Sequence, residues 1–184
     1  MRLFAHFAAG LGLILALAAP ALAQPITPAQ HDALATRIEA FDAAMRVSDM
    51  TGIMGVVPPA VLDEIAKQNN ITSEQLIAAA QQQIDAAMAN ITLVSFGMEL
   101  DKAEYKTLSD NSTYALIPTE TVMDLGPAGG GKFRATSSTL GLLDGETWYL
   151  VRVEDPQQVV LLKQVYPAFA DVTFPAGKME PVTE

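Results

Sequence analysis

Apolar side chains recur at steps of three and four after residue 27, which is the spacing of one face of an α-helix. Leu34, Ile38, Phe41 and Met45 form the first such stripe and predict a long helix. The segment from Thr27 to Gln30 is a start signal, because a threonine cap, a proline in the first turn and a glutamine three residues on satisfy free backbone amides. The helix is therefore expected to begin at residue 28.

The same periodicity continues to about residue 90 and returns near the end of the chain. A short helical piece is expected over 49–57, a helix over Pro59–Gln68, and another after Thr72, which can act as a cap with Gln75. A last short helix is expected over 156–164. The first half of the chain is therefore mainly helical.

From Ile91 the pattern changes to the alternation that is typical of strands, with turn residues about every dozen positions. Asp110-Asn111 and Asp144-Gly145 are expected hairpin turns, and 124–131 is a glycine-rich loop. The tail from about residue 178 is expected to be loose. The expected strands are 92–100, 103–108, 113–123, 132–143 and 147–153.

Helices followed by antiparallel strands indicate an α+β fold in which N-terminal helices pack on one face of a curved antiparallel sheet. The strands over 113–123 and 132–143 carry apolar residues on both faces; Leu116 and Ile117 are neighbours on opposite faces. One face packs on the helices, so the other is expected to meet a second copy of the chain. We therefore expect a homodimer.

Residues 1–23 have the parts of a secretory signal peptide. Arg2 gives a positive start, and residues 3–19 are almost continuously apolar. Ala21-Leu22-Ala23 is a cleavage motif of the small-x-small type, directly before Gln24. The apolar run is short and rich in alanine for a membrane span, which needs roughly 20 apolar residues. We expect cleavage after Ala23, a periplasmic or secreted protein, and no membrane segment afterwards.

Charge and composition exclude several classes of function. The chain has a net charge of −10, whereas nucleic acids and anionic lipids select clustered Lys and Arg. It has no cysteine and two histidines, of which only His31 follows the signal segment. Zinc sites of the His/Cys type are therefore excluded. His-based nucleophilic catalysis would have to use His31, and an exposed helix start is a poor place for it. We expect no cofactor and no metal.

The glycine-rich segment 126–132 matches the first seven positions of a phosphate-binding P-loop. The eighth position should be Ser or Thr to hold magnesium, but it is Phe133, and a strand rather than a helix follows. We interpret the segment as a hairpin loop that binds no nucleotide. The acidic clusters near residues 63, 101 and 154 lack the spacing of a calcium loop.

The order of elements resembles the NTF2-like superfamily, whose ketosteroid isomerase and SnoaL-type members fold as a cone. Four short segments carry this resemblance, at 58–62, 114–119, 144–149 and 166–167. It implies one NTF2-like domain over 24–184 in which a curved sheet encloses a pocket. The helical insertion near 59–90 is longer than a minimal cone needs, and we expect it to cover the pocket mouth.

Within such a cone, a tyrosine can polarise a carbonyl while a carboxylate moves a proton, as in ketosteroid isomerase. Tyr114 and Glu120 lie on one strand at an even separation and share a face, as do Trp148 and Arg152 on another. These four residues are the pocket candidates; the alternative is that the aromatic residues are core and the charged ones solvated.

Two functions remain open. The first is an exported, non-enzymatic binding or assembly module that holds a small apolar ligand or a protein partner. The second is a small acid-base enzyme of the isomerase or hydratase type that uses a carboxylate and a tyrosine in the cone. A carboxylate inside an open apolar cavity would favour the enzyme, because such a group has a raised pKa. A cone filled by apolar side chains would favour partner binding.

Overall fold

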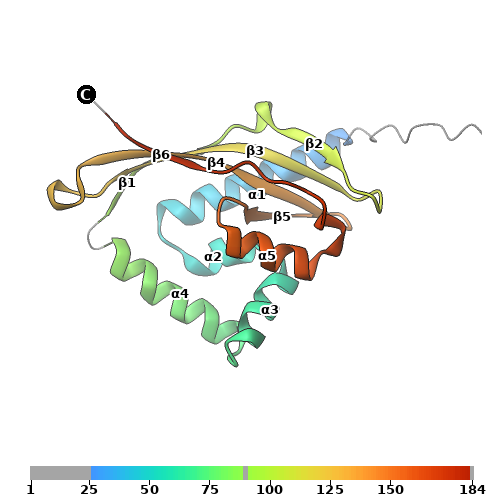
Figure 1. Ribbon diagram of the computed structural model, residues 1–184, viewed down its shortest axis with the longest axis horizontal. Coiled ribbons are helices and arrows are strands. Elements are labelled where there is room, and N and C mark those ends of the chain that lie inside the picture. Colours follow the sequence, from blue (N-terminus) through green and yellow to red (C-terminus); the bar gives the residue numbers. More distant parts are fainter. Residues whose placement is uncertain (1–25, 89–90, 183–184) are drawn as a thin grey trace, which may run out of the picture.

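The computed structural model describes residues 26–88 and 91–182, so the expected signal peptide and cleavage site lie outside the described residues. Four helices come first in the described part, and six strands follow, with a fifth helix between the last two strands (Figure 1). The helices are α1 Pro28–Arg46, α2 Met50–Gly55, α3 Pro59–Gln68, α4 Ser73–Met88 and α5 Pro156–Val165. The strands are β1 Thr92–Met98, β2 Glu104–Thr107, β3 Thr113–Asp124, β4 Lys132–Asp144, β5 Thr147–Arg152 and β6 Lys178–Pro181. Short 3-10 turns are η1 Leu100–Lys102, η2 Pro127–Gly129 and η3 Pro167–Phe169.

Two helix starts form as the sequence predicts. At α1 the Gln30 amide donates to Thr27 Oγ1 at 3.2 Å, and the Thr27 amide donates to Gln30 Oε1 at 2.9 Å. Thr72 and Gln75 make the same reciprocal pair at α4, at 3.2 and 2.9 Å. Each pair satisfies two backbone amides that have no partner inside the helix.

The strands form one antiparallel, strongly curled sheet, which confirms the predicted fold class. Its order is β1-β3-β4-β5, while β2 also pairs with β3 and β6 also pairs with β4. β3 and β4 are therefore the long central strands. Besides pairing with each other, β3 pairs with β1 and β2, and β4 pairs with β5 and β6. In Figure 1, β1, β3, β4 and β6 run along the top of the molecule.

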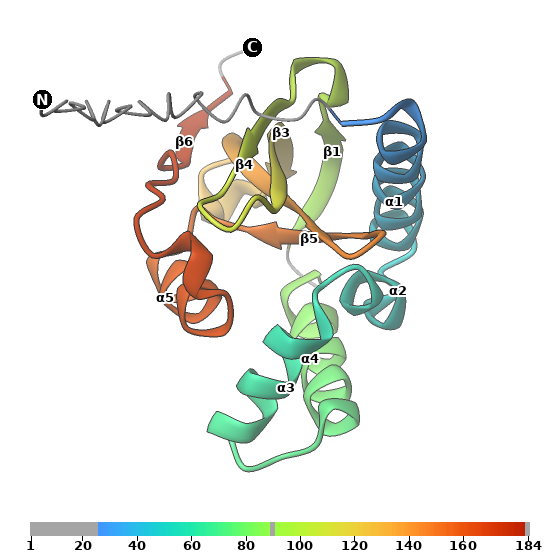
Figure 2. The same ribbon diagram turned by 90° about the vertical axis from the view of Figure 1, so that its right-hand side faces the viewer.

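Helices cover both faces of this sheet, on opposite sides of it (Figure 2). On the α1 face, Leu34 and Val56 pack with Ala115, Ile117, Trp148 and Leu150. On the α5 face, Leu162 and Phe169 pack with Tyr114, Leu116, Leu140, Leu142 and Val151. The β3 residues alternate strictly between the two clusters, as the pleat of an unbroken strand requires.

The second apolar face of β3 is covered by the chain itself, which removes the reason for expecting a dimer there. Ile117 is 0% exposed against the α1 side and Leu116 is 8% exposed against the α5 side. The sequence does not show that α5 and the turn after it fold back over the sheet. A homodimer stays a prediction, but it does not need this face.

The helical insertion does not lie over the sheet. α3 and α4 pack against each other and against α5 and α2, and they project from the rest of the molecule in Figure 2. Gln81 fixes α4, because its Oε1 accepts from the Met50 amide at 3.2 Å. No helix of the described part is long and apolar enough to cross a membrane.

β1 contains one residue more than its partner strand. Leu93 lies opposite Met123 and Ser95 lies opposite Val122, so Val94 is the extra residue of a β-bulge. Val94 is also one of the most exposed large apolar residues of the described part. As a result Leu93 and Phe96, at an odd separation, face the same side of the sheet.

The tail beyond residue 177 is paired rather than loose over Lys178–Pro181, where β6 runs antiparallel to β4. All four side chains of β6 are exposed. The strand therefore forms through its main chain, and its sequence carries no alternating apolar pattern from which it could be predicted.

Candidate functional site

The four sequence-derived candidates lie on two opposite faces of the sheet. Tyr114 pairs with Leu142, and Leu142 pairs with Tyr149, so all three face α5. Trp148 pairs with Leu143 and faces α1. Tyr149 and Trp148 are consecutive, so their side chains point to opposite faces of the sheet. Trp148 and Arg152 therefore share the α1 face. Tyr114 and Glu120 share the α5 face. The structure does not bring the four side chains together.

Tyr114 is a core residue. It is 6% exposed, and its ring meets Phe169 edge-on with the centroids 5.3 Å apart. Glu120 lies six residues further along β3, about 20 Å away at the rise of a strand. A tyrosine and a carboxylate at this separation cannot act on the same small substrate.

Trp148 is also core, and it joins the sheet to the first helix. It is 1% exposed, and its Nε1 donates to the carbonyl oxygen of Gln30 at 2.8 Å. A buried indole needs such a partner. Trp148 therefore positions α1 and leaves no ring face open to a ligand. Its strand neighbour Arg152 is exposed and pairs with Glu154.

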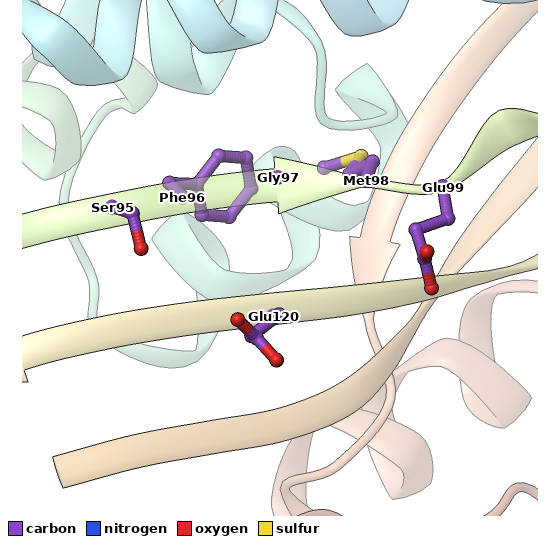
Figure 3. Close-up of a pocket in the computed structure, with 6 residues that line it drawn as sticks. All are labelled: Ser95, Phe96, Gly97, Met98, Glu99 and Glu120. Atoms are coloured by element: carbon purple, nitrogen blue, oxygen red, sulfur yellow. The ribbon is translucent and has the colours of Figure 1, made fainter. Parts of the chain in front are cut away.

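Glu120 lies at an open depression along β1 and β3 (Figure 3). The depression has a volume of about 350 Å³. It forms because Gly97, opposite Glu120, has no side chain, and no atom lies within 4 Å of where a Cβ would stand. Its lining residues are Ser95, Phe96, Gly97, Met98, Glu99 and Glu120.

Both carboxylates of this depression already have cationic partners. Glu120 lies 3.3 Å from Arg134, and Glu99 lies 2.6 Å from Lys102. Glu120 and Arg134 are each about half exposed, so their ion pair is solvated and weak. The depression therefore lacks the dry environment in which a carboxylate becomes a strong general acid or base.

A second depression in the described part is also open to solvent. It has a volume of about 390 Å³ and lies between the end of α3 and α5, where Gln68, Val160 and Leu161 contribute to its lining. No His, Asp or Glu group of the described residues is arranged to hold a metal ion.

The glycine-rich segment 125–131 is the hairpin loop between β3 and β4, as expected. Its amides are used inside the loop: Gly129 and Gly131 both donate to the Gly126 carbonyl, at 3.1 and 2.9 Å. The Gly126 amide donates to Asp124 Oδ1 at 2.8 Å. Amides that already donate to oxygen atoms of the loop are not free to cradle a phosphate.

One further surface was not found from the sequence. At the end of the sheet that carries the β3–β4 loop, apolar residues from four strands face the α1 side but are not fully buried. We name this surface the apolar end of the sheet; its members are Leu93, Phe96, Met123, Phe133, Ala135 and Met179. Met179 is 59% exposed. The alternation in the sequence indicated an apolar face here, but not how far α1 covers it; Phe41 of α1 packs on Phe96, with the ring centroids 5.5 Å apart.

Comparison with known proteins gives no match to a family model, to a curated protein or to a solved structure. The structure by itself defines the class: an α+β protein with N-terminal helices against a curled, half-barrel antiparallel sheet.

Proposed function

We propose that the protein is an exported, non-enzymatic binding or assembly module of the NTF2-like type, and that it binds a protein partner. The NTF2-like assignment is supported by the order of elements, with helices first and a curled antiparallel sheet wrapped against them. Export is supported by the positive start, the apolar run and the small-residue cleavage motif of residues 1–23.

The observation that carries the proposal is the filled interior. Both faces of the central sheet are packed with apolar side chains, from Ile117 on one side to Leu140 and Phe169 on the other. The candidate carboxylate, Glu120, lies outside that interior and in contact with solvent. A filled cone favours partner binding over a buried ligand, and no observation favours the acid-base enzyme.

The apolar end of the sheet is the surface we assign to the partner. None of its six members is charged, although the chain as a whole carries a net charge of −10. Four neighbouring strands span roughly 15 Å, and about six residues along them span roughly 20 Å, so the patch covers at most about 300 Å². An apolar patch of this size on a monomer often has a function.

The size of this patch also limits the kind of partner that it can bind. A stable complex of two globular proteins buries about 800 Å² on each side, which is more than this patch provides. We therefore propose an uncharged, apolar segment of another protein, such as one face of an amphipathic helix, rather than a second globular copy.

Neighbouring residues on β6 give a matched test. Met179 faces the apolar end of the sheet, and Glu180 faces the opposite side, because successive side chains of a strand alternate. A photo-cross-linking amino acid at position 179, in cells that export the protein, is expected to give one discrete adduct. The same group at position 180 is expected to give none.

A second variant tests whether the adduct depends on the apolar end of the sheet. Phe133→Asp places a charge in the patch and should abolish the adduct from position 179 while circular dichroism shows an unchanged fold. Equal adducts from both positions, or an adduct that survives Phe133→Asp, would contradict the proposed surface. A small molecule that co-purifies with the chain in native mass spectrometry would favour the ligand-binding alternative.

A further inference from the structure

β6 pairs with the rest of the molecule through its main chain. Its four side chains are exposed, and none of its residues belongs to either core cluster. Its ladder with β4 covers four register pairs, from Phe133 opposite Pro181 to Thr136 opposite Lys178. Beyond the ladder, the Val182 amide donates to the Lys132 carbonyl at 2.9 Å.

The chain that leads into β6 is anchored separately. Phe174 packs on the α5-side core, and its ring centroid is 6.0 Å from that of Phe169. Only 175–177, which have no regular structure, separate this anchor from β6. The strand can therefore detach without moving the core, since segments with few buried contacts open at a low free energy.

Detachment would expose a specific edge of the sheet. β5 pairs with β4 over Thr139–Asp144, and β6 pairs with it at Phe133–Thr136. When β6 leaves, the main chain of β4 at 133–136 loses its only neighbour on that side among the described residues. An unpaired edge is a template for another strand.

We propose that β6 is an exchangeable strand, and that the vacated edge of β4 accepts β6 from a second copy of the chain. The second copy is the occupant that the structure already matches in register. In that register Arg134 lies opposite Glu180, and opposite charges directly across a strand pair stabilise it. Exchange of identical elements between copies needs no new contacts. This inference does not rest on the proposed function.

The absence of cysteine from the chain makes the exchange directly testable. Thr136 and Lys178 are both exposed and lie opposite each other, and paired strand positions are about 4.5–5.5 Å apart between Cα atoms, within disulfide range. One chain carries Thr136→Cys; a second chain, lengthened by a tag, carries Lys178→Cys. The two full-length chains are mixed at high concentration and oxidised.

Exchange predicts a disulfide-linked heterodimer, several-fold more abundant on a non-reducing gel than from a mismatched mixture. The matched control replaces Lys178→Cys by Met179→Cys, which lies on the opposite face and cannot meet position 136. Equal yields from the two mixtures would overturn the proposal, because random collisions would then account for both.

A doubly substituted chain makes the test decisive. Thr136→Cys and Lys178→Cys in one chain should form an intrachain disulfide at low concentration, where β6 stays on its own β4, and disulfide-linked dimers at high concentration, where it exchanges. An intrachain bond without any excess heterodimer would show that β6 stays in its own chain. Failure of both would refute the β4–β6 register on which the proposal depends.

Discussion

Trp148 and Gln30, 118 residues apart, are joined by a hydrogen bond of 2.8 Å from the indole nitrogen to a carbonyl oxygen in the first turn of α1. The bond links β5 to the start of the helix that covers one face of the sheet. The indole is itself buried in the same cluster as Leu34 and Ile117. One side chain therefore fixes both the packing and the position of α1.

Trp148→Ala is expected to lower the free energy of unfolding by about 3–5 kcal/mol, the usual cost of removing a buried aromatic side chain. Trp148→Phe should cost less, because it keeps most of the volume and loses the hydrogen bond. Urea unfolding followed by circular dichroism measures both. Arg152→Ala, at an exposed position of the same strand, is the control and should change stability by less than about 0.5 kcal/mol. A Trp148→Ala effect as small as that of the control would contradict the packing described here.

Thr119 and Thr139 form a buried hydroxyl pair, with their Oγ1 atoms 2.8 Å apart, and Thr119 Oγ1 also donates to the Ile117 carbonyl at 3.0 Å. Since Thr119 donates to that carbonyl, Thr139 is the donor within the pair. Thr119→Val leaves this donor buried without a partner and should cost about 1–3 kcal/mol.

The double variant Thr119→Val/Thr139→Val should be less destabilised than the sum of the two single variants, because both polar groups are then removed together. A double-mutant cycle from denaturant unfolding measures the coupling. Strict additivity would show that the two hydroxyls do not interact.

Ionisation of the Tyr166 hydroxyl is expected to lower the stability of the fold in alkaline solution. Burial, together with the nearby carboxylate of Asp144, raises the pKa of Tyr166 from 10.0 to about 12; the hydroxyl lies 3.5 Å from Asp144 Oδ2. The folded state therefore holds this proton more tightly than the unfolded state does. The resulting stability is fully present below pH 10 and is lost as the pH rises towards 12.

Tyr166→Phe should flatten the fall in stability over this pH range, and absorbance at alkaline pH should show one fewer late-titrating tyrosine. Burial raises the pKa of Tyr105 as well, so Tyr105→Phe is the matched comparison. If Tyr166→Phe leaves the alkaline profile unchanged, the assignment of this titration to Tyr166 is wrong.

Export predicts a defined mass for the mature protein. Protein recovered from the envelope or the medium should begin at Gln24, and its intact mass should lack residues 1–23. Ala23→Leu removes the small residue at the exit and should slow processing. A mass that still contains Met1 to Ala23 would contradict cleavage.

Much of the fold could be predicted because its signals are local. The capping pairs of Thr27 and Thr72, the stripe from Leu34 and the alternation along β3 each depend on a few neighbouring residues. The helix bounds of α3 and the start of β3 agree with the prediction for this reason. The strand faces also agree, because alternation fixes which β3 residues lie together.

The candidate site could not be predicted in the same way, because it depends on how distant elements meet. Tyr114 and Trp148 are both aromatic residues in strands, but register places them on opposite faces. The chain does not show locally that α5 and Phe169 cover the side to which Tyr114 points. β6 has no local signal at all, since its pairing uses the main chain and leaves its side chains in solvent.

The bulge at Val94 makes the length of β1 adjustable. Leu93 and Phe96 face the same side only because the extra residue lies between them. If Val94 is deleted, Leu93, Ser95 and Phe96 follow one another in ordinary alternation, and both apolar residues still point to the same side. A one-residue deletion, which in a regular strand would turn half of the side chains to the wrong face, leaves the facing of β1 intact. Relatives of this chain are therefore expected to differ in length at this position and to keep the same sheet.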